Sequence, residues 1–273
     1  MPEGHVIHRL ARMLTTEFAG QPVHVFSPQG VFASQAALLD GTVLERAEAF
    51  GKHLFIHFSA PSPERIVHIH LGLIGSLGFQ AADRPLQGKV RLALSNDAQV
   101  AHLHGPQWCR LITEEEMAAA TAKLGADPLR TDQDEKRAEM RARVLKSRRT
   151  VGSLLMDQGL YAGVGNIYRA ETLFRLGIHP DVRGVDLEPA QVDAVWEDLV
   201  ALMRAGEAAG RIDTVRPEHM PEAMGRAPRK DDHGGEVYVY RRAGLPCYVC
   251  GAEIQERVLE GRNLFWCPGC QGR

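Results

Sequence analysis

The chain has 273 residues, of which 44% are hydrophobic and 24% are charged, and its formal net charge is −2. This composition is typical of a globular protein with room for two domains and a small appendix. No apolar run is long enough for a membrane helix, so we expect no membrane partner, and the overall charge does not by itself indicate a polyanionic partner.

Apolar residues at helical spacing predict a first helix over residues 3–19. From residue 22 to about 112 the pattern changes to short apolar strands separated by Gly, Pro, Ser and Asp, as in a β-sandwich or barrel. The clearest strands are expected at residues 23–26, 54–58, 66–71 and 90–94.

The second half of the chain changes to helical spacing. Residues 130–138 are polar and charged, which favours a linker there. Helices are expected after it, and residues 210–235 are expected to form a mobile loop, because they combine Pro, Gly and charge with little periodicity. The three predicted helices are at residues 148–158, 166–176 and 189–208.

Four cysteines near the C-terminus form two CxxC pairs separated by a short segment: Cys247, Cys250, Cys267 and Cys270. Four thiolates at this spacing make a closed, structural Zn²⁺ site, and the residues between them read as a hairpin turning at Gly261. Two disulfides are the alternative, which suits a secreted chain.

The chain begins without a signal segment, so we expect reduced cysteines and a cytoplasmic location. At Cys109, which has no partner spacing, we expect a buried and inert thiol.

Together these patterns predict an α+β multidomain protein. It consists of an N-terminal β-sandwich behind a leading helix, a helical domain and a C-terminal four-cysteine zinc hairpin. The expected boundaries are residues 1–130, 136–225 and 236–273.

The N-terminus offers a possible nucleophile. Pro2 is small enough to permit removal of Met1, which would leave a secondary amine that attacks carbonyl carbon when unprotonated. The amine has an ordinary pKa near 8, and the positive end of a helix dipole should lower it. Glu3 could then transfer protons. Pro-Glu is also ordinary first-turn chemistry of a helix, and this reading remains open.

Two turns of the strand region could also carry function. Lys52 lies in a Gly-Lys turn before an expected strand, where a solvated lysine is the simpler interpretation. Leu73 and Ile74 lie between two glycines, where they could form an apolar wedge of the kind that unstacks DNA bases, or a buried corner. His68 and His70 alternate on one strand, and we expect them to be packed or hydrogen-bonded rather than to bind a metal.

A basic segment at residues 136–149 precedes the glycine-rich segment 158–168. Backbone amides at a glycine-rich turn before a helix can hold an anion, and the Asn166 amide could add a donor. The two segments together suggest a clamp for nucleic-acid phosphates. A solvated helix face followed by a tight turn without ligand is the alternative.

The order of these motifs resembles the formamidopyrimidine-DNA glycosylase and endonuclease VIII family from the first residue to the last. The most specific parts are a helix-two-turn-helix segment and the zinc hairpin with its Gly-Arg tip. The matching motifs are MPEG at 1–4, GK at 51–52, HLGLIG at 70–75, DQGLYAGVGNIYRAE at 157–171 and GRNLFWCPGC at 261–270.

The resemblance implies a bifunctional DNA glycosylase and AP lyase of base-excision repair. It acts as a monomer with one structural zinc on double-stranded DNA with oxidised bases or abasic sites. By the same resemblance, the Pro2 amine forms a Schiff base at C1′, Glu3 supplies a proton, and Lys52 and Arg262 serve β- and δ-elimination. The implied DNA contacts are Asn166 to phosphate, Leu73 in the base stack and Lys123 near the DNA.

The branches of this family differ in substrate. The MPEG start and the YRAE segment resemble the endonuclease VIII branch, which prefers oxidised pyrimidines. The Arg-Arg-Phe element of the purine branch is replaced by the stretch 104–110, and only Leu73 remains of the Gln-Leu-Tyr triple of endonuclease VIII. The alternatives are the same fold acting on oxidised purines, and a non-catalytic DNA-binding protein with a zinc ribbon.

Overall fold

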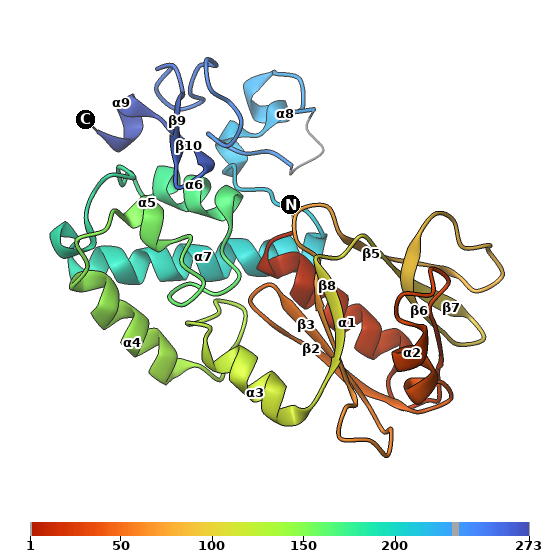
Figure 1. The fold of residues 1–273 in the computed structure, drawn as a ribbon. Coiled ribbons are helices and arrows are strands. Elements are labelled where there is room, and N and C mark those ends of the chain that lie inside the picture. The colour runs from red at the N-terminus through yellow and green to blue at the C-terminus, as the bar shows by residue number, and fades with distance from the viewer. Residues whose placement is uncertain (1, 231–234, 273) are drawn as a thin grey trace. The chain divides into compact units, whose positions relative to one another are not determined.

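The computed structural model describes residues 2–230 and 235–272, and the chain forms two compact units, Met1–Lys123 and Leu124–Arg273 (Figure 1). Met1, whose removal the resemblance requires, and part of the expected loop 210–235 lie outside the described residues. No helix in the described ranges combines the length and the apolar character that crossing a membrane demands.

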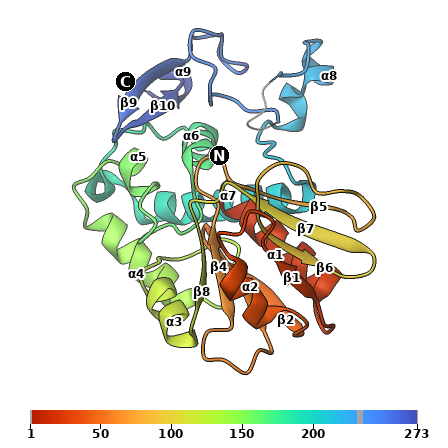
Figure 2. The ribbon, with the colours of Figure 1, turned by 45° about the vertical axis from the view of Figure 1, so that its right-hand side comes forward.

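The first unit is a leading helix with two four-stranded antiparallel sheets (Figure 2). Helix α1, Gly4–Phe18, packs along β2 and β3. One sheet has the order β2 (Leu44–Phe50), β3 (His53–Phe58), β4 (Ile66–His70) and β8 (Trp108–Ile112). The other has the order β1 (His24–Phe26), β6 (Val90–Ser95), β7 (Gln99–His104) and β5 (Ser76–Ala81). Two helices complete the unit, α2 (Ala33–Leu39) and α3 (Glu114–Ala122).

Strand β3 shows why the leading helix and the β-rich domain could be predicted. Leu54 and Ile56 enter the main core, to which α1 contributes Leu14 and Phe18. Phe55 points the other way, into a small cluster with Met117 of α3. Because both faces of β3 are covered, the strand is a continuous apolar run rather than an alternating one.

Strand β2 was not predicted, because its charged residues hide the pattern. Glu45, Arg46 and Glu48 lie in it, and a register shift occurs between Leu44 and Arg46 opposite β3. A shift of this kind breaks the period of two that a strand prediction needs. Pairing with the buried β3, rather than local preference, therefore decides that this segment is a strand.

The second unit is mostly helical and ends in a β-hairpin. Its longer helices are α4 (Asp134–Leu145), α6 (Asn166–Arg175) and α7 (Pro189–Ala209), and its shorter ones are α5 (Val151–Leu154), α8 (Pro221–Met224), α9 (Pro268–Gln271), η1 (Gly184–Asp186) and η2 (Pro217–His219). The hairpin strands are β9 (Gln255–Leu259) and β10 (Arg262–Trp266).

Two predictions in this unit were wrong in extent. The expected linker 130–138 overlaps the start of α4, whose polar face favoured a linker because only Met140 and Val144 are buried. The expected helix 148–158 shortens to the single turn α5. The described part of 210–235 contains η2 and α8, so it is not wholly irregular.

A buried carboxylate on α6 holds the segment that leads into the hairpin. Glu171 is fully buried and accepts hydrogen bonds from the backbone N–H groups of Tyr238, Val239 and Tyr240 at 2.7, 2.8 and 2.9 Å. The hydroxyl of Thr214 donates a fourth bond at 2.5 Å. These bonds compensate for burying the charge and tie residues 237–240 to the helical core.

We expect Glu171→Ala to lower the free energy of unfolding by about 3 kcal/mol, because several buried backbone donors lose their partner. The measurement is urea denaturation of the zinc-loaded protein. Glu135→Ala, at an exposed position of α4, is the control and should change stability by less than about 0.5 kcal/mol. Equal midpoints for the two variants would contradict the anchoring role.

Candidate functional site

The N-terminal residues lie beside the Lys52 turn. The Thr15 hydroxyl donates to the Ala47 carbonyl at 3.2 Å, and Ala19 bridges Leu44, so α1 and β2 run in opposite directions. From Thr15 back to Gly4 and from Ala47 on to Lys52 the chain covers roughly 16 Å in each case. Measured along the β2 direction, the start of α1 and the β2–β3 turn therefore lie at the same height in the first unit.

At the start of α1, Glu3 is fully buried and occupies the N-cap position, while Pro2 before it is half-exposed. The Glu3 carbonyl accepts the first backbone bond of the helix, from Val6 at 3.0 Å. After removal of Met1, a chain amine on Pro2 would face the unsatisfied N–H groups and positive dipole of the helix start.

The loop that carries Leu73 emerges at the same end of the β2–β3–β4–β8 sheet. His53 directly follows Lys52 and pairs with His70, the last residue of β4, and His70 pairs with Trp108, the first residue of β8. The segment 71–75 therefore leaves the sheet next to the Gly-Lys turn. This placement brings Lys52 and Leu73 to one edge, which their separation in the sequence does not reveal.

Leu73 and Ile74 project from this loop instead of filling a buried corner. Their exposed fractions are 65% and 87%. Gly72 adopts φ +70° and approaches the Gln107 side chain so closely that a Cβ would lie 2.9 Å from it. The Gly72 N–H donates to the His70 ring at 3.1 Å, which fixes the base of the loop. An exposed apolar pair on a fixed base has the geometry of a wedge.

Histidines pack and hydrogen-bond to one another under this edge, as expected. The rings of His53 and His68 are joined by a 2.9 Å hydrogen bond, and His70 stacks on Trp108 with ring centroids 4.5 Å apart. Burial lowers the pKa of His53 to about 4 and that of His68 to about 3. The pKa of His70 is also lowered, first by burial and then by the Lys52 charge.

Two further predicted positions are Lys123 at the end of α3 and Cys109 in β8. Lys123 is exposed and ends α3 as its C-cap residue, so it marks the end of the first unit. Cys109 is half-buried in β8, and burial of its thiol raises the pKa to about 12. A thiol held neutral in this way is inert, as expected.

In the second unit, the glycine-rich segment forms two turns between α5 and α6. The Gln158 amide holds them from inside, because it donates to the Val164 carbonyl at 2.9 Å and accepts from the Gly163 N–H at 3.1 Å. Gly163 adopts φ +89°, a conformation that favours glycine. Gly165 then serves as the N-cap of α6, and Asn166 is its first residue.

Asn166 joins these turns to the hairpin. Its amide nitrogen donates to the Asn263 carbonyl at 2.9 Å, and the buried Arg169 donates to the same carbonyl at 3.1 Å. Arg169 also donates to the Asn166 amide oxygen. Arg262, the neighbour of Asn263, is thereby placed near Asn166. The sequence did not single out Arg169, and no spacing or motif signal marked it as a buried cation.

The tip of the hairpin is a two-residue turn. Leu259 pairs with Arg262, and the residues between them, Glu260 and Gly261, both have positive φ, 49° and 74°. This is the type I′ geometry that suits a two-residue hairpin. The Ser153 hydroxyl of α5 donates to the Glu260 carboxylate at 2.5 Å, so the tip is held to the helical core at a second point.

The four cysteines converge at the base of this hairpin. Their sulfur atoms all lie within 4.8 Å of one another. Cys247 and Cys270 are separated by 3.8 Å, and Cys250 and Cys267 by 3.4 Å, far longer than a disulfide bond of about 2.05 Å. Tetrahedral Zn²⁺ with bonds of about 2.3 Å requires sulfur atoms roughly 3.8 Å apart. The cysteines therefore fit one structural zinc ion, and the disulfide alternative is excluded.

The basic segment 136–149 is partly neutralised by neighbouring carboxylates. Arg141 binds Asp193 at 2.8 Å, Arg143 binds Glu139 at 3.4 Å, and Arg149 binds Asp157 at 2.7 Å. Three of its seven basic residues are thus paired, which favours a solvated face in part, and the proposed phosphate clamp stays a prediction.

Because His53 and His68 are largely buried and neutral, we expect the free energy of unfolding to fall at acid pH. The folded-state pKa values of His53 and His68 lie below the ordinary value of 6.5, so the unfolded chain binds more protons from about pH 6.5 down to about pH 3. Stability should be full above pH 6.5 and decline as the pH falls through this window. We expect His53→Gln to reduce the slope, as measured by urea midpoints at successive pH values. Val31→Ala, at an exposed position without a titratable side chain, should keep the wild-type slope; identical slopes for both variants would refute the assignment.

Zinc removal should unfold the hairpin, because Cys247, Cys267, Ile254 and Phe265 belong to the core of the second unit. We expect Cys250→Ser to lose zinc and to lower the melting temperature, with metal content measured by mass spectrometry. Cys109→Ala should retain one zinc per chain. Retention of wild-type zinc and stability by the Cys250 variant would argue against a structural ion.

Three models of known protein families match successive parts of this chain. Residues 1–107 match the formamidopyrimidine-DNA glycosylase N-terminal domain, and residues 124–216 match the formamidopyrimidine-DNA glycosylase H2TH domain. Residues 244–272 match the zinc finger found in FPG and IleRS. The three matches cover the leading helix and sheets, the helices around Asn166, and the cysteine hairpin.

Similar proteins cover the full length. "Endonuclease 8 1" of Mycobacterium tuberculosis is 47% identical over 99% of this chain and 100% of its own. A formamidopyrimidine-DNA glycosylase of Thermosynechococcus vestitus is 36% identical over 84% of this chain and 79% of its own. Among solved structures, MutM in complex with carbocyclic 8-oxo-G containing DNA has the same fold, with a TM-score of 0.78 at 22% identity over 100% of both chains.

A relative of this identity over the whole chain, together with the three domain matches, establishes the family. The zinc-ribbon alternative without catalysis is thereby set aside. The chain belongs to the formamidopyrimidine-DNA glycosylase and endonuclease VIII family, whose members are DNA glycosylases with AP lyase activity.

Proposed function

We propose that this protein removes oxidised pyrimidines from double-stranded DNA and then cleaves the strand at the resulting abasic site by β,δ-elimination, through a Schiff base on Pro2. The observation that carries the proposal lies within the first unit. The start of α1, with Pro2 and Glu3, reaches the same level as the Lys52 turn, beside the loop of Leu73 and Ile74. The proposed nucleophile Pro2, the Glu3 carboxyl, the Lys52 cation and the proposed wedge would therefore share one edge.

The first chemical step would use the Pro2 amine, once Met1 has been removed. Its nitrogen lone pair attacks C1′ while the glycosidic bond breaks, the bond's electron pair leaves with the base, and the base takes up the proton that the Pro2 nitrogen releases. Opening of the sugar gives an iminium ion between Pro2 and C1′. The buried Glu3 carboxyl, next in the chain, would supply the proton to the ring oxygen.

The elimination steps follow from the iminium ion, which acidifies the proton on C2′. Loss of this proton sends an electron pair toward C3′ and expels the 3′ phosphate, and a second elimination expels the 5′ phosphate. Hydrolysis then frees Pro2. We assign Lys52 to the first elimination and Arg262 to the second, as cations that bind the departing phosphates. Asn166 would bind a neighbouring phosphate, and Lys123 is retained as a DNA contact of the first unit.

The choice of pyrimidines rests on similarity. The relative at 47% identity carries the name endonuclease 8, whereas the formamidopyrimidine-DNA glycosylase compared above reaches 36%. The exposed loop has no aromatic or polar side chain beside Leu73, so recognition of the opposite base would depend on Ile74 and on other groups. The monomeric state, the cytoplasmic location and the three-domain boundaries expected from the sequence stay predictions.

Borohydride trapping tests the proposed nucleophile. A covalent protein–DNA adduct should form with abasic DNA and with duplexes containing thymine glycol, and should be lost in Pro2→Gly preparations that retain Met1, as checked by intact mass. The yield with 8-oxoguanine duplexes should be lower by about tenfold or more. An adduct that persists when Met1 is retained would disprove attack by Pro2, and a preference for 8-oxoguanine would disprove the pyrimidine assignment.

A second prediction concerns the wedge. Chemistry at C1′ requires the base to leave the stack, and an apolar side chain fills the void. We expect Leu73→Ala combined with Ile74→Ala to slow base removal from duplex DNA by about tenfold or more. Cleavage of single-stranded abasic DNA should change little, since no stacked void has to be filled.

Leu38→Ala is the matched control for this prediction, because Leu38 is an exposed leucine on α2. It should leave both reactions unchanged. Equal slowing on duplex and single-stranded substrates by the double variant would mean that the loop acts on the chemical step rather than on the opened stack.

A further inference from the structure

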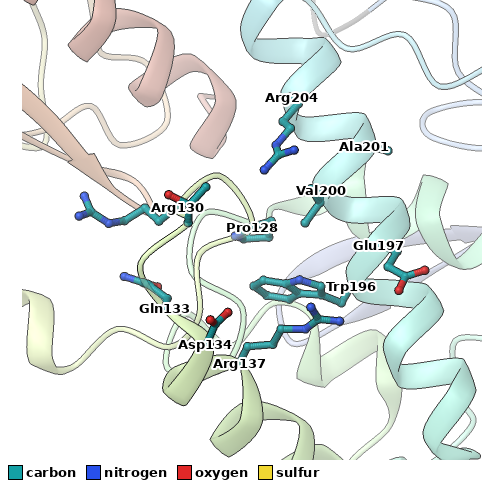
Figure 3. A pocket seen from close by; sticks show the side chains of 11 residues that line it. Pro128, Arg130, Gln133, Asp134, Arg137, Trp196, Glu197, Val200, Ala201 and Arg204 are labelled. Atoms are coloured by element: carbon teal, nitrogen blue, oxygen red, sulfur yellow. The ribbon is translucent and has the colours of Figure 1, made fainter.

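A cavity in the second unit lies outside the residues assigned above. It encloses about 440 Å³ between the segment before α4, the first turns of α4 and the middle of α7 (Figure 3). This volume is within the range of roughly 300–1,000 Å³ that small-molecule sites occupy. None of its lining residues belongs to the zinc site, to the turns before α6 or to the hairpin.

One wall of the cavity is apolar. Pro128, Trp196 and Val200 form it, and Figure 3 shows the indole of Trp196 lying below the Pro128 ring, with Val200 close by on α7. The Arg137 guanidinium covers the indole from the other side, 5.5 Å from the ring centroid. Trp196 is thus fixed in place and largely buried, and a flat apolar ligand would rest against Pro128, Val200 and the small part of the indole that borders the cavity.

The second side of the cavity carries positive charge, from the exposed Arg204 one helical turn beyond Val200 on the same face of α7. Arg204 extends from α7 toward the apolar residues in Figure 3, and Arg130 lies at the far side of the cavity. Arg130 is engaged by Asp132 at 2.6 Å. Arg204 makes no side-chain hydrogen bond or ion pair with any residue in the described ranges 2–230 and 235–272.

The lack of a protein partner sets Arg204 apart from neighbouring arginines. Arg141 on α4 and Arg175 on α6 each bind a carboxylate of α7, at 2.8 and 2.9 Å. The cavity also contains Asp134 and Glu197, but Figure 3 shows the Glu197 carboxylate directed away from Arg204. A guanidinium beside an apolar wall, with its donors unused, is suited to a planar anion that it can bind with two hydrogen bonds.

We propose that this cavity binds a nucleoside monophosphate, with the base against Pro128, Val200 and the edge of Trp196 and the phosphate on Arg204. The base supplies the flat apolar surface and the phosphate supplies the anion that the two walls require. The same chemistry is offered by a free nucleotide and by the 5′-phosphorylated end of a DNA strand. The inference goes beyond the proposed repair activity and does not depend on it.

Isothermal titration calorimetry of the zinc-loaded protein, without lesion DNA, tests the proposal with dAMP as the probe. We expect saturable binding of one dAMP per chain. Deoxyadenosine and inorganic phosphate should each bind about tenfold more weakly or worse, because each fills only one wall. A 5′-phosphorylated oligonucleotide compared with its unphosphorylated form separates the free nucleotide from the strand end as the source.

Substitutions in the cavity test whether dAMP binds there. Arg204→Gln should weaken dAMP binding by about tenfold, and Ala201→Trp, which fills the cavity from an exposed position of α7, should abolish it. Arg183→Gln, at an exposed arginine outside the cavity, is the matched charge control and should bind dAMP as the wild type does.

Three results would overturn the proposal. They are the absence of saturable dAMP binding to the wild type, wild-type affinity in the Ala201→Trp variant, and equal affinity for dAMP and inorganic phosphate. A failed trapping experiment would leave these results unaffected, because no covalent chemistry enters this measurement.

Discussion

Helix α6 carries two buried charges on which the arrangement of the second unit depends. Arg169 binds the Asn166 amide and the Asn263 carbonyl, and Glu171 binds the backbone that leads to the first zinc cysteines. Buried charges of this kind are stable only when their hydrogen bonds are satisfied. The helix therefore holds both ends of the hairpin module, its entering segment and its strand β10, in one position relative to Asn166.

Zinc contributes the remaining constraint. The hairpin has only two short strands, which cannot bury enough surface to fold alone. The four thiolates close its base, Ser153 holds Glu260 at its tip, and Phe265 enters the helical core. The zinc site, the Ser153–Glu260 hydrogen bond and the packing of Phe265 together position Arg262. None of these groups takes part in the proposed chemistry.

In the first unit, the antiparallel packing of α1 on β2 positions the candidate residues. Because Thr15 bonds to Ala47, the helix start and the β2–β3 turn end at the same level. The pairing of His53 with His70 then brings the Leu73 loop to this edge. Three segments far apart in the sequence meet there, and the neutral histidines below them keep further positive charge away from Lys52.

Much of this organisation could be predicted from residues alone. The zinc site followed from cysteine spacing, α1, α6 and α7 from helical periodicity, and β3 and β4 from apolar runs between turn residues. Strand β2 and helix α4 were not predicted. Their exposed faces are charged, so the local sequence pattern favoured a loop or a linker. The burial of Arg169 and Glu171 could not be foreseen, since charged residues on a helix ordinarily face water.

The order of residues along the chain determined which chemical groups are present: a proline and a glutamate at the start, a lysine in a glycine turn, an asparagine after glycines, and four thiols. Tertiary structure alone decided which of them meet, that Leu73 and Ile74 are exposed rather than a buried corner, and that Arg204 lies beside an apolar wall. The physical reason is that proximity across a sheet edge or between helices arises from pairing register and packing. Neither leaves a local trace in the sequence around the residues concerned.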